Sequence, residues 1–108
     1  MSKKMIFNRS PEESNLDRKV KEYIKTTYRQ DAWFLKVVGS ASQHSGVPDI
    51  ICCIRGKFIC IEDKREDGSG KVSKNQLIEI KKINKAGGHA IVSNNLEEIK
   101  KYIASIVE

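Results

Sequence analysis

The chain has 108 residues, of which 39% are hydrophobic and 31% charged, so it is long enough for one modest hydrophobic core and too short for two. This balance excludes a disordered chain, which has too little apolar surface to bury, and a membrane protein, which carries fewer charges. The formal net charge of +6 suits a polyanionic partner, because each phosphate contact releases condensed counterions. A solvated basic surface explains the same charge equally well.

All three cysteines lie in apolar, strand-like runs: Cys52, Cys53 and Cys60. There is no CxxC pair, and His44 and His89 lie far apart in the sequence, so no structural zinc site is expected. An odd number of buried thiols is typical of core packing in a reducing compartment. The apolar run 5–7 is too short for a signal peptide, and no transmembrane segment follows it. We therefore expect a cytoplasmic protein.

The first predicted helix begins after Ser10, with Pro11 at the first helical position and Glu13 three residues after the cap. Apolar residues then recur at helical spacing up to about residue 28: Leu16, Val20, Tyr23 and Ile24. At about 100° per residue, Glu13 projects near the middle of this apolar stripe and Glu12 lies farther to its side. An acid on the inward face of a helix is a candidate site residue.

Residues 33–38 predict a strand, and the polar stretch 39–46 predicts a loop that leads to Pro48-Asp49. A β-hairpin follows if Arg55-Gly56 is a two-residue turn. In that register Ile54 pairs with Lys57, and Asp49 lies opposite Glu62.

This register places the Asp49 and Glu62 carboxylates on the same face of neighbouring strands, with Cβ atoms roughly 4.5–5.5 Å apart. Two carboxylates so close destabilise a sheet unless a cation neutralises them. Lys64 points to the same face as Glu62, and Asp63 points to the other face, because side chains alternate along a strand. Pro-Asp at a strand start and Glu-Asp-Lys at a strand end are also ordinary ways to begin and end strands.

Both faces of the hairpin are apolar, which requires cover on both sides, and we expect helices to supply it. Ser73 begins a second helix that ends at Gly87-Gly88, and residues 89–93 form a further strand. Asn94 or Asn95 begins the last helix. The result is an α/β fold of order α-β-β-β-α-β-α with a right-handed βαβ crossover, in a single domain that spans residues 1–108.

The Gly-rich run 65–72 contains Gly70-Lys71, as a phosphate-binding P-loop does. Val72 follows where that motif requires Ser or Thr, so no nucleotide cofactor is expected.

Two facing carboxylates with a third on a neighbouring helix make an oxygen-rich pocket that suits Mg²⁺, which takes one or two protein carboxylates and completes its shell with water and phosphate oxygens. Such an ion polarises a phosphodiester and activates water. Lys64 is placed to orient that water or to neutralise charge on the reacting phosphate.

Pro48-Asp49 followed by Glu62-Asp63-Lys64 resembles the signature of PD-(D/E)XK nucleases. The surrounding segments narrow the resemblance to the VRR-NUC family of phage, bacterial and eukaryotic repair nucleases, and it covers residues 13–96. Those segments are 36–40, 46–51, 56–58, 61–65, 73–76 and 86–88. The resemblance implies a restriction-endonuclease-like core with a mixed sheet flanked by helices, dependence on Mg²⁺ or Mn²⁺, and hydrolysis of DNA phosphodiester bonds.

The resemblance also implies roles for individual residues. Asp49 and Glu62 correspond to metal ligands, Lys64 to the catalytic lysine and Glu13, with Glu12 as the alternative, to the acid of the first helix. Gln76 matches a glutamine beside the family's site, although a solvated helix residue is an equal alternative. The main-chain carbonyl of Ile61 is expected as a further metal ligand. Asp63 stands where the family usually has an apolar residue, and we expect it to point outward or to pair with a helix lysine.

The resulting prediction is a metal-dependent, structure-selective DNA endonuclease, similar to Holliday-junction resolvases, that acts as a homodimer on four-way junctions in a bacterial or phage-infected cell. The alternatives are a non-catalytic DNA-binding module on a nuclease scaffold, a flap or duplex nuclease, and a small metal-binding protein without nucleic acid. The homodimer is expected from the small size of the domain and from the resemblance. The sequence itself shows no interface such as a heptad seam.

Overall fold

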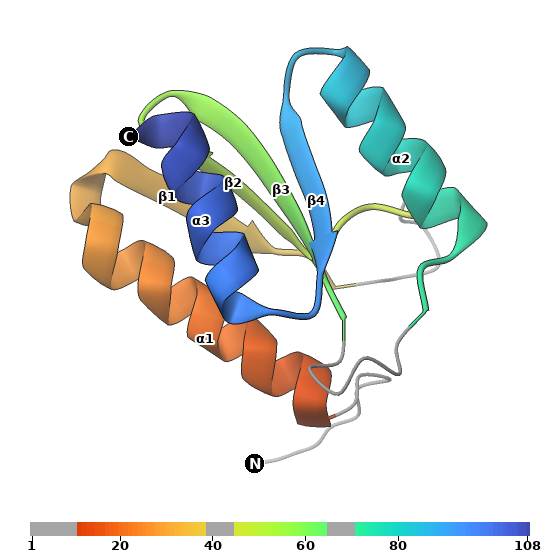
Figure 1. Cartoon of the computed structure of the whole chain (residues 1–108), viewed down its shortest axis with the longest axis horizontal. Coiled ribbons are helices and arrows are strands. Elements are labelled where there is room, and N and C mark those ends of the chain that lie inside the picture. The colour runs from red at the N-terminus through yellow and green to blue at the C-terminus, as the bar shows by residue number, and fades with distance from the viewer. Residues whose placement is uncertain (1–10, 39–44, 65–70) are drawn as a thin grey trace.

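A computed structural model of the chain describes residues 11–38, 45–64 and 71–108, with side chains from residue 15 onward. The elements follow the predicted order (Figure 1). They are helix α1 (Pro11–Tyr28), a 3₁₀ turn (Arg29–Asp31), strands β1 (Ala32–Lys36), β2 (Ile50–Ile54) and β3 (Lys57–Asp63), helix α2 (Lys74–Lys85), strand β4 (His89–Ser93) and helix α3 (Leu96–Val107). The predicted cap at Ser10, most of the loop 39–46 and most of the run 65–72 lie outside the described residues.

The four strands form one mixed sheet in the order β1-β2-β3-β4, antiparallel except for the parallel pair β3 and β4. The hairpin register is confirmed, because Ile54 pairs with Lys57 and Ile50 with Ile61. Arg55 and Gly56 both have positive φ angles, 50° and 82°, as a two-residue turn of the type that joins twisted strands requires.

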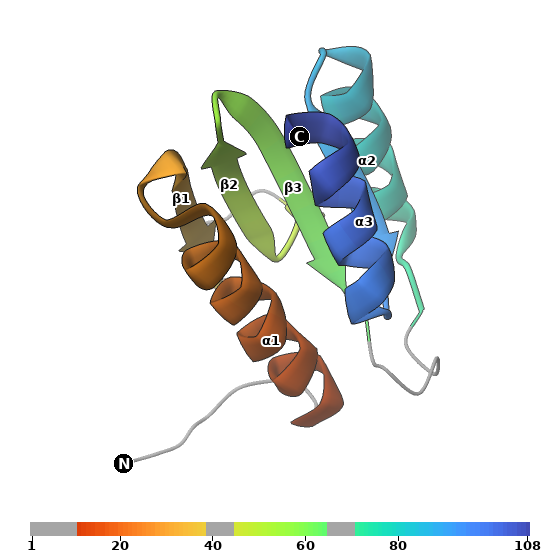
Figure 2. The ribbon, with the colours of Figure 1, turned by 60° about the vertical axis from the view of Figure 1, so that its left-hand side comes forward.

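Helices α1 and α3 cover one face of the sheet, and α2 lies on the other face beside β4 (Figures 1 and 2). The core lies between the sheet and the first pair of helices. It includes the predicted stripe of α1 and the alternate residues of β2 and β3: Leu16, Val20, Ile24, Ile50, Cys52, Ile54, Ile59, Ile61, Ile99 and Ile103. Burying a side chain of this size contributes about 1.5–3 kcal/mol, so this layer supplies most of the hydrophobic stabilisation.

The expectation that helices cover both faces of the hairpin is wrong. Helix α2 packs mainly against β4 and has no fully buried residue, because the crossover from β3 to its parallel neighbour carries the helix away from the hairpin. On the outer side of the first three strands, Trp33 remains 59% exposed and Phe58 48% exposed. Cys53 is also exposed, so the prediction of three buried thiols holds only for Cys52 and Cys60.

Local capping fixes where α2 and α3 begin. The Ser73 hydroxyl accepts from the backbone N–H of Gln76, while the Gln76 side chain accepts from the N–H of Ser73, which together form a capping box. Asn95 caps α3 through the N–H of Glu98. Within the described part of the chain, no helix is long and apolar enough to span a membrane.

Gly46 lets the chain before Asp49 pass close to the start of α2. Its φ is +85°, and a Cβ there would lie 2.5 Å from the main-chain oxygen of Asn75. Glycine is therefore required at this crossing. The crossing brings the approach to β2 beside the first turn of α2, where Gln76 lies.

Candidate active site

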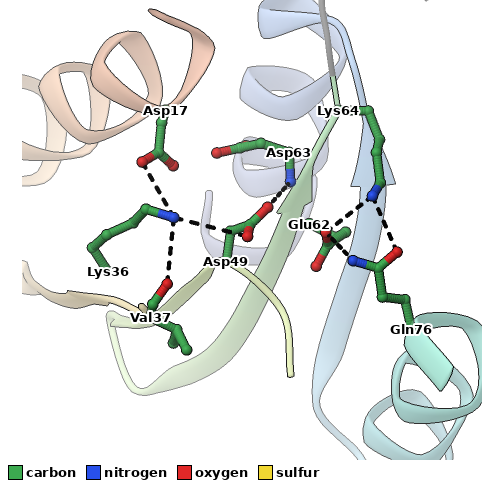
Figure 3. Close-up of polar contacts among 8 residues, drawn as sticks. All are labelled: Asp17, Lys36, Val37, Asp49, Glu62, Asp63, Lys64 and Gln76. Atoms are coloured by element: carbon green, nitrogen blue, oxygen red, sulfur yellow. Dashed lines mark hydrogen bonds and ion pairs between the residues drawn. The ribbon is translucent and has the colours of Figure 1, made fainter. Parts of the chain in front are cut away.

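Polar side chains gather at one end of the sheet, where β2 begins and β3 ends (Figure 3). Asp49 directly precedes β2, Glu62 and Asp63 are the last residues of β3, and Lys64 follows them. Gln76 reaches the same place from the first turn of α2. Of the residues predicted as a site, the structure thus brings together Asp49, Glu62, Lys64 and Gln76.

Glu62 is 2% exposed and is held by Lys64 and Gln76. One carboxylate oxygen, Oε2, lies 3.2 Å from Lys64 Nζ and accepts a hydrogen bond from Gln76 Nε2. Lys64 Nζ donates in turn to Gln76 Oε1 at 3.0 Å. These three side chains therefore form a closed ring of polar contacts on the α2 side of the sheet.

The second oxygen of Glu62, Oε1, is buried and has no hydrogen-bond donor among the described residues. The pKa of Glu62 is raised to about 7, first by burial and then by the negative charge of Asp49, while Lys64 opposes both effects. Asp49 and Glu62 therefore lie close enough to repel each other, as the predicted register requires. A cation between these two carboxylates would remove the repulsion.

Asp49 connects this ring to a second cluster on the α1 side. Its Oδ2 accepts a hydrogen bond of 2.9 Å from the backbone N–H of Asp63, and its Oδ1 lies 3.8 Å from Lys36 Nζ. Asp49 is thus fixed from the β3 side and from the β1 side at once.

The expectation that Asp63 points outward or pairs with a helix lysine is wrong. Asp63 does lie on the opposite face from Glu62, as alternation requires, but that face is covered by α1, and the residue is 1% exposed. Figure 3 shows its carboxylate directed toward Asp17. The pKa of Asp63 is raised to about 10, first by burial and then by its contact with Asp17. Asp63 is therefore protonated at neutral pH and able to donate a hydrogen bond to Asp17.

Two members of the α1-side cluster, Asp17 and Lys36, were not predicted. Lys36 Nζ lies 3.5 Å from Asp17 Oδ2 and donates to the main-chain oxygen of Val37. Asp17 is only 4% exposed. A sequence signal existed for both, because Asp17 lies one helical turn after Glu13 and beside the apolar stripe, and Lys36 occupies an inward position of its strand.

The predicted acid of the first helix stays a prediction. Glu13 and its alternative Glu12 both lie in the first turn of α1, and the described side chains begin after them. Asp17, one turn farther along, is the first acid of this helix that the structure places at the site.

Within the described residues, no three side chains of the His, Cys, Asp and Glu types form a group able to hold a metal ion. A Mg²⁺ site needs fewer, because water and phosphate oxygens complete its shell. The Asp49 and Glu62 carboxylates fit this requirement, since they are close together and one Glu62 oxygen lacks a donor.

The strand pairing also indicates which main-chain carbonyl could join the two carboxylates as a metal ligand. Ile61, the predicted donor, is paired on both sides, with Ile50 and Ile91, so its backbone lies inside the sheet. The N–H of Asp63 points to Asp49, and in a strand the carbonyl of the same residue points to the same side. The Asp63 carbonyl is therefore better placed than that of Ile61 to join Asp49.

A four-stranded mixed sheet between α1 and α3 on one face and α2 on the other, with two acids and a lysine at the β2–β3 end, defines the PD-(D/E)XK type of α/β fold. Two solved structures share it. One, a "VRR_NUC domain", has a TM-score of 0.70 and 24% sequence identity, over 88% of this chain and 97% of that one. The other, a "VRR_NUC domain protein", has a TM-score of 0.68 and 22% identity, over 89% and 91%.

The chain therefore has the VRR-NUC fold, which confirms the predicted fold class and the resemblance at the level of structure. No protein-family model matches the sequence, and neither does any curated protein.

Proposed function

We propose that this protein is a metal-dependent DNA endonuclease. The observation that carries the proposal is the convergence of Asp49, Glu62 and Lys64 at one end of the sheet, with the two carboxylates close together and Lys64 in contact with Glu62. The fold shared with VRR_NUC domains and the net charge of +6 support DNA as the substrate.

The Asp49 and Glu62 carboxylates, with the Asp63 carbonyl, would hold Mg²⁺ or Mn²⁺. Such an ion would supply polarisation of the scissile phosphate and activation of water. Lys64 is a mobile cation with three donors, so it can orient that water and stabilise negative charge on the phosphate oxygens. Gln76 holds both Glu62 and Lys64 and so fixes their separation.

The proposal is tested by incubating the protein with labelled DNA in Mg²⁺ or Mn²⁺, and in EDTA as control. We expect cleavage with either ion and none in EDTA. A protein that binds DNA but leaves every substrate intact in both ions would be the non-catalytic DNA-binding module instead. The presence of all three signature side chains in contact favours the enzyme.

We further propose that the substrate is branched DNA and that the active form is a homodimer that cleaves four-way junctions. One site cuts one strand, and a two-fold dimer would present two sites to symmetry-related strands. A panel of duplex, flap, splayed and four-way substrates, with light scattering at the same protein concentration, tests both statements. A monomer that cuts flaps or duplex as well as junctions would refute the junction proposal and leave the nuclease proposal standing.

A further inference from the structure

The side of the sheet that carries α2 has a regular pattern across its first three strands. The strand register aligns three successive rows of side chains on this side: Trp33–Cys53–Phe58, Leu35–Ile51–Cys60, and Val37–Asp49–Glu62. We call the first two rows the outer face. Neither row contains a charged residue, and the third row holds the two carboxylates of the candidate active site. An apolar surface thus runs along the strands directly to the site.

The outer face is exposed where it is most apolar. Trp33 is 59% exposed, Leu35 49% and Phe58 48%. Phe58 also borders a cavity of about 340 Å³ whose other walls are Ile83 and residues 86–88 of the turn after α2. Large side chains of this kind are seldom left together in water without a function.

Positive charge lies on the same side of the sheet as this apolar surface, along α2. Helix α2, on the same side of the sheet, carries four exposed lysines and one acid: Lys74, Lys81, Lys82, Lys85 and Glu79. Exposed aromatic rings next to lysines are the combination that binds single-stranded nucleic acid, because the rings stack on bases while the cations meet the phosphates.

We propose that the outer face receives unpaired bases of the strand being cut, with Trp33 and Phe58 as stacking platforms. The inference rests on the proposed nuclease function and specifies its substrate class. Two rows along a strand correspond to about 13 Å, so the platforms lie a few nucleotides from the carboxylates. Bases inside a duplex are stacked on one another and cannot use such a surface. The substrate is therefore DNA with unpaired bases next to the cleaved bond, which in a branched substrate lie at the branch point.

A second copy of the chain fits this surface less well. A second sheet packed on the outer face would lie about 10 Å away and extend over the row that contains Asp49 and Glu62. It would thereby cover the Asp49 and Glu62 carboxylates, which lie in the next row of the same face. Single-stranded DNA would instead stack its bases on this apolar surface, and its backbone would continue toward the carboxylates.

Trp33 is the only tryptophan of the chain, so its fluorescence reports directly on this surface. We would titrate the protein, in EDTA, with a splayed fork carrying two unpaired arms and with a blunt duplex of equal length. The fork should quench Trp33 and bind more tightly than the duplex. Phe58→Ala and Trp33→Leu, which keeps apolar bulk without an aromatic ring, should each weaken fork binding roughly tenfold and leave duplex binding within about twofold. Trp33→Phe should bind like the unaltered protein.

Ile78→Ala, at an exposed apolar residue of α2 outside the three rows, is the matched control and should bind both DNAs normally. Equal binding of fork and duplex without quenching of Trp33, or unchanged fork affinity in both Trp33→Leu and Phe58→Ala, would overturn the inference even if the protein cuts DNA. A dimer that becomes a monomer in Trp33→Asp by light scattering would also overturn it, in favour of contact between copies. A protein that binds no DNA at all would instead refute the proposed function.

Discussion

The two sides of the active-site end contain similar residues in different states. On the α2 side, Glu62 contacts Lys64 and Gln76 and keeps one oxygen without a donor. On the α1 side, Asp63 is buried beneath α1, and its raised pKa makes it a neutral carboxylic acid at neutral pH. The alternation of one strand sends these adjacent acids to opposite faces. Burial raises both pKa values, to about 7 for Glu62 and about 10 for Asp63, so of these two acids only Glu62 is a carboxylate able to bind a cation near neutral pH.

The largest effect is expected from Asp49→Asn and Glu62→Gln, which remove the negative charge that would hold the proposed metal ion. Each should lower the single-turnover cleavage rate by roughly a thousandfold or more, because the ion stabilises the transition state by several kcal/mol. Both variants should fold and bind DNA, and the apo proteins should gain a little stability because like-charge repulsion is removed. Full activity in either variant would refute the site assignment.

Lys64→Ala should have the next largest effect, about a hundredfold on turnover, with little change in metal affinity, because Lys64 acts on the reacting phosphate. Cleavage rates measured over a range of Mg²⁺ concentrations separate the two parameters. The exposed Lys101→Ala, on α3 at the other face of the sheet, is the control and should be normal. If high Mg²⁺ restores the rate of Lys64→Ala, the assigned role is wrong.

Gln76→Glu separates the proposed role of Gln76 in positioning Glu62 and Lys64 from its role in capping α2. Glutamate preserves the capping box but removes the amide that donates to Glu62 and adds a like charge beside it. We expect turnover to fall about tenfold with nearly unchanged thermal stability. Gln76→Ala should lose activity and also about 1 kcal/mol of stability, because the cap is broken. An active Gln76→Glu enzyme would show that the amide is not needed.

The pH dependence of stability distinguishes Glu62 on the α2 side from Asp63 on the α1 side. These effects are smaller than those of the substitutions above. Both acids have pKa values raised by folding, so the folded state keeps a proton that the unfolded state releases, and stability falls as pH rises. Glu62 contributes to this fall between about pH 4.5 and 7, and Asp63 between about 3.8 and 10.

Thermal unfolding measured from pH 5 to 9 therefore tests each residue separately. Asp63→Asn should flatten the decline above pH 7 and stabilise the protein at pH 8 by about 1–3 kcal/mol, since a neutral amide replaces the buried acid. Glu62→Gln should flatten only the decline below pH 7. A slope between pH 7 and 8, below the range in which the buried thiols Cys52 and Cys60 contribute, that survives in Asp63→Asn would contradict the buried neutral acid.

Local pattern was enough to predict the order of elements, the hairpin register and the meeting of Asp49 with Glu62. Each depends on a short-range rule: helical spacing, strand alternation and a two-residue turn. Asp17 and Lys36 were missed because their contact depends on how α1 packs across β1, which no local period encodes. Asp63 was misplaced for the same reason, since alternation gives its face but not the helix that covers it.

The expectation that helices cover both faces of the hairpin was wrong for a similar reason, because helix packing is not encoded in the local sequence pattern. Apolar residues on both faces of the hairpin indicated burial on both, but the crossover places α2 beside β4 and leaves Trp33 and Phe58 exposed. In a sequence, an exposed aromatic residue has the same pattern as a buried one. Only the position of the crossover helix α2 shows which aromatic residues are exposed.

Cleavage of a labelled four-way junction in Mg²⁺ by three proteins, unaltered, Glu62→Gln and Asp63→Asn, tests the central claim most directly. Each variant changes one of two adjacent acids to its amide. Glu62→Gln affects the α2 side of the sheet, and Asp63→Asn affects the α1 side. The account predicts cleavage by the unaltered protein and by Asp63→Asn, and none by Glu62→Gln. Cleavage by Glu62→Gln at the unaltered rate, or loss of activity in Asp63→Asn as complete as in Glu62→Gln, would contradict it.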